Sequence, residues 1–342
     1  MIYRSKAPLR IGLAGGGTDV SPYCDQFGGA ILNATLSLHA HATIELTDDH
    51  SIHLHSIDKN ETVSYEWAAE LPINGTLDLL KGVYNRIQKD YPFQKKGIRL
   101  STYVDAPAGS GLGTSSTLVV AIIGVFAEML KLPLGDYDMA HYAYEIERVD
   151  LKLAGGRQDQ YAATFGGFNY MEFYSGDKVI VNPLRIRQDY LSELENNLVL
   201  YFTATTRESA SIITEQQKNV TNNNHKSIEA MHQLKEQARM MKEALLIGKL
   251  DQIGEILDYG FRQKKEMAAN ISNMHIDDIY RSALKAGASG GKISGAGGGG
   301  FMIFYCPKNT RYQVMETLTN FGGRISPYQF TQHGLTSWTI AS

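Results

Sequence analysis

Three glycine-rich segments, at residues 15–19, 109–116 and 295–300, are the parts of this sequence best suited to binding an anion. In the middle segment, alternating glycines precede three hydroxyl residues, Thr114, Ser115 and Ser116, at the expected start of a helix. Glycine lets the backbone approach a ligand closely, and the first N–H groups of a helix carry partial positive charge. The segment therefore indicates either a phosphate-binding loop or hydroxyl side chains that only cap the helix.

Two carboxylates after the middle segment are candidates for metal binding and proton transfer. Glu147 lies at the margin of the apolar stripe of an expected helix. Asp159 lies between two glutamines, shortly after a glycine pair at 155–156. Together they could supply a magnesium ligand and a general base. The alternative interpretation is that Glu147 is solvated and Asp159 caps a helix.

Two familiar nucleotide-binding motifs are excluded. A Walker-type loop would need a glycine where Ala286 stands and a hydroxyl where Ile293 stands, around Gly291 and Lys292. The pattern Gly-x-Gly-x-x-Gly at 295–300 comes before an expected strand, whereas a Rossmann turn follows one. Any phosphate must therefore be bound in another way.

The elements that would position these residues follow from hydrophobic periodicity. We expect strands near 9–13, 38–46, 98–104, 167–174, 197–202 and 301–306, and a short strand at 52–54 that forms a hairpin with 38–46. We expect helices near 77–90, from 118 onward, 137–149, 227–245, 250–267 and 276–286. A strand-rich half, 1–195, then precedes a helix-rich half, 196–342, which predicts an α+β protein of two domains.

Length and composition fit this division. The chain has 342 residues, with 33 Lys and Arg against 36 Asp and Glu, a net charge of −3. This balance gives no bulk electrostatic reason to bind nucleic acid or an anionic membrane. We see no targeting segment, and the longest apolar run, 118–127, is about half of a membrane span. Two cysteines, Cys24 and Cys306, form no disulfide framework, so we expect a cytoplasmic protein.

Two histidine pairs, His39-x-His41 and His53-x-His55, each place two imidazoles on one strand face. If the two strands pair, a zinc site is geometrically possible, with Cys24 or a carboxylate as a further ligand. The alternative is that these histidines are polar residues of a hairpin that line a pocket or face solvent.

The three segments, in this order, resemble the motifs of the small-molecule kinase superfamily named for galactokinase, homoserine kinase, mevalonate kinase and phosphomevalonate kinase. The resemblance runs through 8–19, 107–116 and 292–299 and so spans nearly the whole chain. It implies an N-terminal half like domain 2 of ribosomal protein S5 and a ferredoxin-like C-terminal half. Segments 15–19 and 156–161 look most like those of the D-glycero-D-manno-heptose 7-phosphate kinases. Galactokinases usually have Glu-His at the position of Gly16-Gly17.

The resemblance implies a role for each matching position. Asp159 matches the catalytic aspartate that accepts or orients the sugar hydroxyl proton, and Arg10 matches its basic partner. Ser115 and Glu147 match the ligands of Mg²⁺. The ATP phosphates would be bound by Pro107, Gly109, Ser110, Gly111, Leu112, Gly113, Thr114, Ser115 and Ser116. The sugar would be bound by Gly16, Gly17, Thr18, Asp19, Gly297 and Gly298. Arg207, after an expected strand, could hold a substrate phosphate as a planar fork or could be a surface arginine.

The expected activity is therefore transfer of the γ-phosphoryl group of Mg·ATP to a sugar. The expected acceptor is the anomeric hydroxyl of heptose 7-phosphate, and the expected enzyme is a monomer or homodimer. One alternative is another sugar 1-kinase, for fucose or galactose. The other is a non-catalytic sugar or nucleotide sensor, which would require loss of the base or of the metal ligands.

Overall fold

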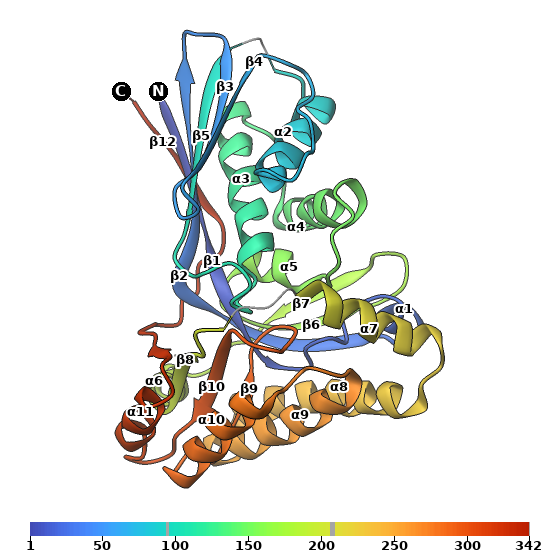
Figure 1. Ribbon diagram of the computed structural model, residues 1–342, viewed down its shortest axis with the longest axis vertical. Helices are drawn as coiled ribbons and strands as arrows, with labels where there is room; N and C mark the ends of the chain where they lie inside the picture. Colours follow the sequence, from blue (N-terminus) through green and yellow to red (C-terminus); the bar gives the residue numbers. More distant parts are fainter. Residues whose placement is uncertain (94–95, 206–208, 342) are drawn as a thin grey trace.

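The computed structural model describes residues 1–93, 96–205 and 209–341, which fold into two β-sheets with helices packed around them (Figure 1). The first sheet has the strand order β12-β1-β2-β5-β3-β4, with β6 paired to β2 and β7 paired to β6. Its strands are β1 (Ile2–Ala14), β2 (Gly29–Thr47), β3 (Ser51–Ser56), β4 (Glu61–Glu66), β5 (Gly97–Val104), β6 (Phe168–Phe173), β7 (Val179–Pro183) and β12 (Thr336–Ile340).

The second sheet has the order β11-β8-β10-β9, and its paired strands are antiparallel. Its strands are β8 (Leu198–Phe202), β9 (Gly290–Ile293), β10 (Phe301–Tyr305) and β11 (Arg324–Ile325). The expected α+β fold is confirmed. The division at residue 195 stays a prediction, and β12 from the C-terminal part pairs with β1 of the first sheet.

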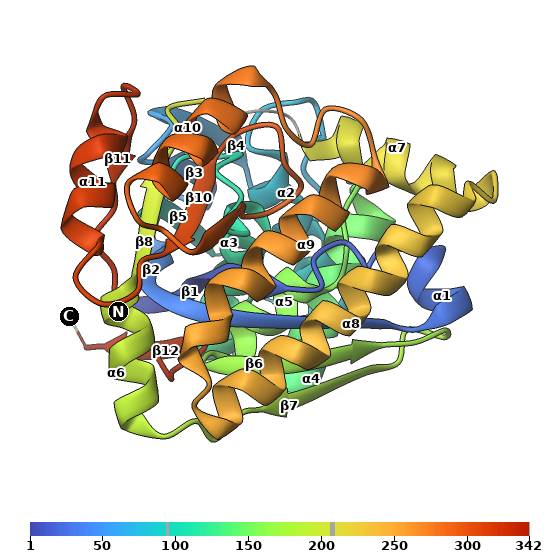
Figure 2. The same cartoon turned by 90° about the horizontal axis from the view of Figure 1, so that it is seen from below.

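The helices lie in two groups. Figure 1 shows α2, α3, α4 and α5 against one face of the first sheet, and Figure 2 shows α8 and α9 side by side across β1 and β2. The helices are α1 (Tyr23–Phe27), α2 (Asp78–Asp90), α3 (Thr114–Leu130), α4 (Asp136–Glu145), α5 (Gln158–Phe165), α6 (Gln188–Asn197), α7 (Ser209–Thr221), α8 (His225–Ile247), α9 (Ile253–Met267), α10 (Met274–Lys285) and α11 (Arg311–Thr319). No helix in the described ranges is long and apolar enough to cross a membrane.

Strand β1 is buried on both of its faces from Ala7 to Ala14. Side chains alternate between the two faces of a strand, so Leu9 and Ile11 pack into the core while Arg10 points to the other side. Because that side is also covered, the Arg10 side chain is only 4% exposed. A charged side chain is thereby held inside the protein, where it needs a charged partner.

Two helices begin or end differently from the sequence prediction. Helix α3 starts at Thr114 rather than at Leu118, because Gly113 adopts the left-handed conformation and the hydroxyl residues form the first turn. The helix expected over 137–149 ends as an α-helix at Glu145 and continues as a π-helical turn, Ile146–Asp150. That turn carries Glu147. π-Helical turns often lie at functional sites.

The predicted hairpin between the 38–46 and 52–54 strands is wrong. Strand β5 lies between β2 and β3, antiparallel to β2 and parallel to β3. Fully buried Ile98 and Leu100 of β5 align with Ile52 and Leu54 of β3, so β5 provides the apolar neighbour that β2 was expected to provide.

The zinc site built from both histidine pairs is therefore wrong as well. His53 and His55 are separated from His39 and His41 by a whole strand, and Cys24 is buried on α1. His39 and His41 lie instead beside Asp105, with ligand atoms of the three side chains within 4.8 Å of one another.

Candidate active site

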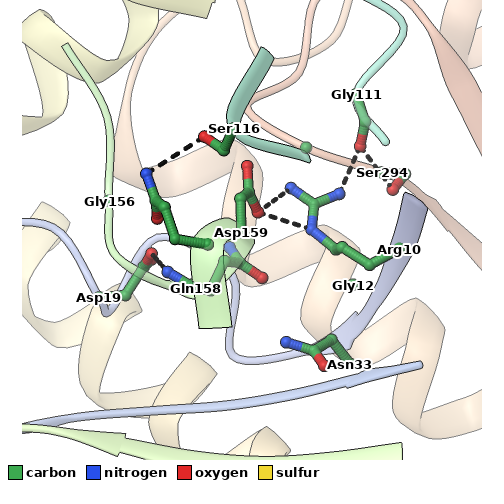
Figure 3. A network of polar contacts seen from close by, with 12 residues as sticks. Arg10, Gly12, Asp19, Asn33, Gly111, Ser116, Gly156, Gln158, Asp159 and Ser294 are labelled. Atoms are coloured by element: carbon green, nitrogen blue, oxygen red, sulfur yellow. Dashed lines mark hydrogen bonds and ion pairs between the residues drawn. The ribbon is translucent and has the colours of Figure 1, made fainter. Parts of the chain in front are cut away.

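An ion pair between Arg10 and Asp159 lies at the centre of the site (Figure 3). Arg10 Nε and Nη2 lie 2.8 and 2.6 Å from Asp159 Oδ1, and Nη1 donates to the carbonyl oxygen of Gly111 at 2.6 Å. A guanidinium keeps its charge at any ordinary pH. Arg10 therefore joins β1, the middle glycine segment and α5 through one permanently charged group.

Asp159 is positioned by the start of α5. Asp19 accepts hydrogen bonds from the backbone N–H groups of Arg157 and Gln158 at 2.8 and 3.0 Å. A Cβ on Gly156 would lie 1.9 Å from Asp19 Oδ2, so glycine is needed there for the two segments to meet. The interpretation of Asp159 as the helix cap is wrong, because Asp19 supplies that contact. Burial raises the pKa of Asp19, with the two amides acting in the opposite direction.

The middle glycine segment forms a tight loop between β5 and α3. Gly109, Gly111 and Gly113 have φ values of 71°, 84° and 77°, which favour glycine. A Cβ on Gly111 would lie 2.4 Å from the carbonyl oxygen of Ser294. The loop therefore packs directly against the third glycine segment. The buried hydroxyl of Ser110 has no hydrogen-bond partner within the described part of the chain.

Glu147 is buried, with 1% of its side chain exposed, so the solvated interpretation is wrong. Its Oε2 accepts a hydrogen bond from Gln160 Nε2 at 2.5 Å, and Gln160 Nε2 also donates to Ser116 Oγ at 3.2 Å. Arg148 Nη1 lies 3.5 Å from Glu147 Oε1. A carboxylate and hydroxyl groups at one end of α3 form the oxygen-rich donor set that suits Mg²⁺.

These groups surround a cavity of about 290 Å³. The predicted site residues that line it are Arg10, Gly16, Gly17, Asp19, Gly109, Gly111, Gly113, Thr114, Ser115, Ser116, Glu147 and Asp159. Pockets of this size with converging polar groups are typical binding sites for small molecules.

Other predicted residues lie around the cavity without lining it. These predicted site residues are Pro107, Ser110, Leu112, Thr18, Gly297 and Gly298. Thr18 instead hydrogen-bonds to the carbonyl oxygens of Gly15 and Ala30. Gly298 donates its N–H to the carbonyl of Ile271. Arg207 lies outside the described residues.

The cavity is also lined by two buried lysines to which the sequence analysis gave no role, Lys264 of α9 and Lys292 of β9. Their side chains are buried, and burial lowers the pKa of Lys264 to about 8 and that of Lys292 well below its usual value. A sequence signal for Lys264 was present. It falls on the apolar stripe of its helix, three residues after Phe261 and three before Met267. A lysine within such a stripe indicates a function for its charge.

Sequence comparison places these features in a known family. Residues 78–167 match the N-terminal domain of GHMP kinases, and residues 241–324 match the C-terminal domain. The chain is 48% identical over 337 residues to a protein of Campylobacter jejuni named D-glycero-alpha-D-manno-heptose 7-phosphate kinase, covering 98% of this chain and 99% of that one.

Solved structures agree. One described as a D-glycero-D-manno-heptose 1-phosphate kinase from Bacteroides thetaiotaomicron has 46% identity and a TM-score of 0.84, over 99% of this chain and 100% of that one. One described as a sugar kinase from Campylobacter jejuni has 47% identity and a TM-score of 0.82, over 99% and 98% of the two chains. With relatives at this identity over nearly its full length, the chain belongs to the GHMP kinase family.

Proposed function

We propose that this GHMP kinase transfers the γ-phosphoryl group of ATP to the anomeric hydroxyl of D-glycero-D-manno-heptose 7-phosphate, giving the 1,7-bisphosphate. The observation that carries the proposal is the Arg10–Asp159 ion pair in a cavity lined by a glycine loop and by Glu147. The name of the Campylobacter relative supports the acceptor. The Bacteroides structure is named as a heptose 1-phosphate kinase, so its name agrees on a heptose phosphate as acceptor but differs in the position of the phosphate.

Asp159 would accept the proton of the attacking hydroxyl. Both contacts between Arg10 and Asp159 are made by Oδ1, so Oδ2 would be the oxygen that accepts the proton from the substrate. The hydroxyl oxygen bonds to the γ-phosphorus, the bond from the γ-phosphorus to the bridging oxygen breaks, and ADP leaves. Arg10 would stabilise the charge on the transferring group, because phosphoryl transfer depends mainly on positioning and charge neutralisation.

The loop at 109–116 would bind the ATP phosphates through backbone N–H groups and the start of α3. Glu147 and Ser115 would hold Mg²⁺, and Ser115 suits this role because its side chain is exposed at the cavity while Ser116 is buried and bonded to Gln160. When bound, Mg²⁺ would neutralise charge on the phosphates. A cytoplasmic location fits the two free cysteines.

The test is ATP consumption by the purified protein with Mg²⁺ across a panel of sugars. The panel contains heptose 7-phosphate, mannose 6-phosphate, fucose and galactose. We expect turnover with heptose 7-phosphate that is lost in Asp159→Ala. Turnover confined to fucose or galactose would overturn the acceptor, and tight ATP binding without turnover of any sugar would favour a sensor.

A further inference from the structure

Two ammonium groups, those of Lys264 and Lys292, are buried against the cavity that holds Asp159. The residues are 4% and 3% exposed. They come from different elements, α9 and β9, so the fold brings two positive charges together from separate parts of the chain. Moving an ammonium out of water is costly unless a negative charge pairs with it.

The protein itself provides little compensation. Lys264 Nζ donates to the carbonyl oxygen of Gly295 at 2.7 Å, and Lys292 Nζ donates to that of Gly12 at 2.8 Å. Among the described residues, neither ammonium has a carboxylate oxygen within 4.0 Å. An ammonium has three N–H donors, so these bonds use one donor of each lysine and neutralise neither charge.

The neighbouring charged groups do not restore the balance. Arg10 adds a third positive charge and lowers the pKa of both lysines, while the Asp19 carboxyl group acts in the opposite direction on the pKa of Lys264. Asp159 is paired with Arg10, and Asp19 uses one oxygen to accept two backbone N–H groups. Among the described residues that line the cavity, four cationic side chains stand against three carboxylates: Arg10, Arg148, Lys264 and Lys292 against Asp19, Glu147 and Asp159. An anionic ligand would supply the negative charge that the cavity lacks.

The position of Lys264 relates this ligand to the sugar side of the cavity. A Cβ placed on Gly16 would lie 3.6 Å from Lys264 Nζ, which puts the ammonium beside the first glycine segment. Ser115 of α3 and Glu147 of the π-helical turn line the same cavity. An anion at the lysines would therefore lie beside the segment assigned to the sugar.

We propose that Lys264 and Lys292 form an anion subsite that binds the phosphate group already present on the sugar substrate. The proposal rests on the proposed function, because it names the part of the substrate that this end of the cavity recognises. A sugar without a phosphate would leave both charges buried and unpaired. The pair therefore selects phosphorylated acceptors, since an unpaired buried charge disfavours the complex.

The kinetic test compares two acceptors that differ only in the phosphate, heptose 7-phosphate and heptose. In Lys264→Met, we expect the KM for heptose 7-phosphate to rise about 10-fold to 100-fold, the range for loss of a charged hydrogen bond. We expect little change in the KM for heptose or for ATP. The control is Lys265→Met, because Lys265 neighbours Lys264 on α9 but is paired with Asp277 at the surface.

A fall in kcat that is equal for both acceptors, with unchanged KM values, would overturn the proposal. That result would assign the lysines to the transferring phosphoryl group. Lys264→Arg keeps the charge and is expected to recover most of the affinity for heptose 7-phosphate. Thermal unfolding of each variant verifies that it is folded.

A binding measurement separates this proposal from the proposed function. The protein is saturated with Mg²⁺ and a non-hydrolysable ATP analogue, which fills the nucleotide phosphate positions, and is then titrated calorimetrically with inorganic phosphate. We expect binding that weakens at least about tenfold in Lys264→Met and is unchanged in Lys265→Met. Equal binding by all three proteins, or none by the wild type, would overturn the subsite. If the protein phosphorylated only fucose, the proposed acceptor would be wrong. The titration would still decide whether Lys264 and Lys292 bind phosphate.

Discussion

Arg10 reaches Asp159 through two nitrogens that meet the same carboxylate oxygen, Oδ1. The other oxygen, Oδ2, lies beside Gly113 of the glycine loop, where an added Cβ would be 3.3 Å away. One oxygen is therefore held by a fixed positive charge, and the other faces the segment assigned to the ATP phosphates. This arrangement lets one carboxylate be oriented by Arg10 and still accept a proton.

Asp159→Asn tests the role of that second oxygen. The amide keeps the size of the side chain but cannot act as a base, so we expect kcat to fall about 10²-fold to 10⁴-fold. The KM for ATP should change little, because the loop at 109–116 is intact. Steady-state kinetics with ATP-binding measurements checks both values. Retention of more than about a tenth of the wild-type kcat would contradict the role.

Arg10→Lys tests whether geometry matters in addition to charge. Lysine supplies a point charge in place of the planar fork that contacts both Asp159 and Gly111. We expect kcat to fall at least about tenfold, with a smaller change in the KM for ATP. Wild-type kcat in Arg10→Lys would show that positive charge alone is sufficient.

Glu147→Gln tests the assignment of the metal ligand. Removing the carboxylate charge weakens an oxygen site for Mg²⁺, so we expect the Mg²⁺ concentration for half-maximal activity to rise about tenfold or more. The measurement is the initial rate as a function of free Mg²⁺ at constant MgATP. Glu145→Gln is the matched control, because Glu145 is two residues away and pairs with Arg86. The same Mg²⁺ dependence in both variants would remove Glu147 from the metal site.

Lys264→Met tests the cost of the buried charge in the absence of ligand. The pKa of Lys264 is lowered from 10.5 to about 8 in the folded protein. Between pH 8 and 10.5 the unfolded chain therefore binds more protons than the folded protein. The free energy of unfolding contributed by Lys264 accordingly rises with pH over this range. Below pH 8 the folded state carries the full cost, which is on the order of 3 kcal/mol.

We therefore expect Lys264→Met to be more stable than the wild type at pH 7 and to lose that advantage by about pH 10. Denaturant unfolding at a series of pH values measures this difference. Lys265→Met should follow the wild type. A ligand-free Lys264→Met that is less stable than the wild type at pH 7 would show that the ammonium is stabilised within the protein.

The sequence was sufficient for the parts of the site that depend on local patterns. Glycines before a hydroxyl-rich helix start indicated the loop at 109–116, and hydrophobic periodicity indicated the strand near 9–13 that carries Arg10. The ordered motifs then brought Arg10 and Asp159 into one proposal. The structure places those two residues in contact although 149 positions separate them.

Features that depend on non-local pairing were beyond the sequence. Nothing local shows that β5 separates β2 from β3, because strand order is decided by how buried faces such as Ile98 and Leu100 pack. The contact between Asp19 and the start of α5 likewise depends on the folding of distant segments. Lys264 was detectable as a charge in an apolar stripe, but its proximity to Lys292 depends on how α9 packs on β9.

The most direct test of the central claim is ³¹P NMR of the product formed from heptose 7-phosphate, ATP and Mg²⁺ by the wild-type protein. The account predicts a new phosphate resonance coupled to the anomeric proton, with the original 7-phosphate signal retained and ADP formed in equal amount. A phosphate on any other hydroxyl, or ADP formed without a new sugar phosphate, would contradict it.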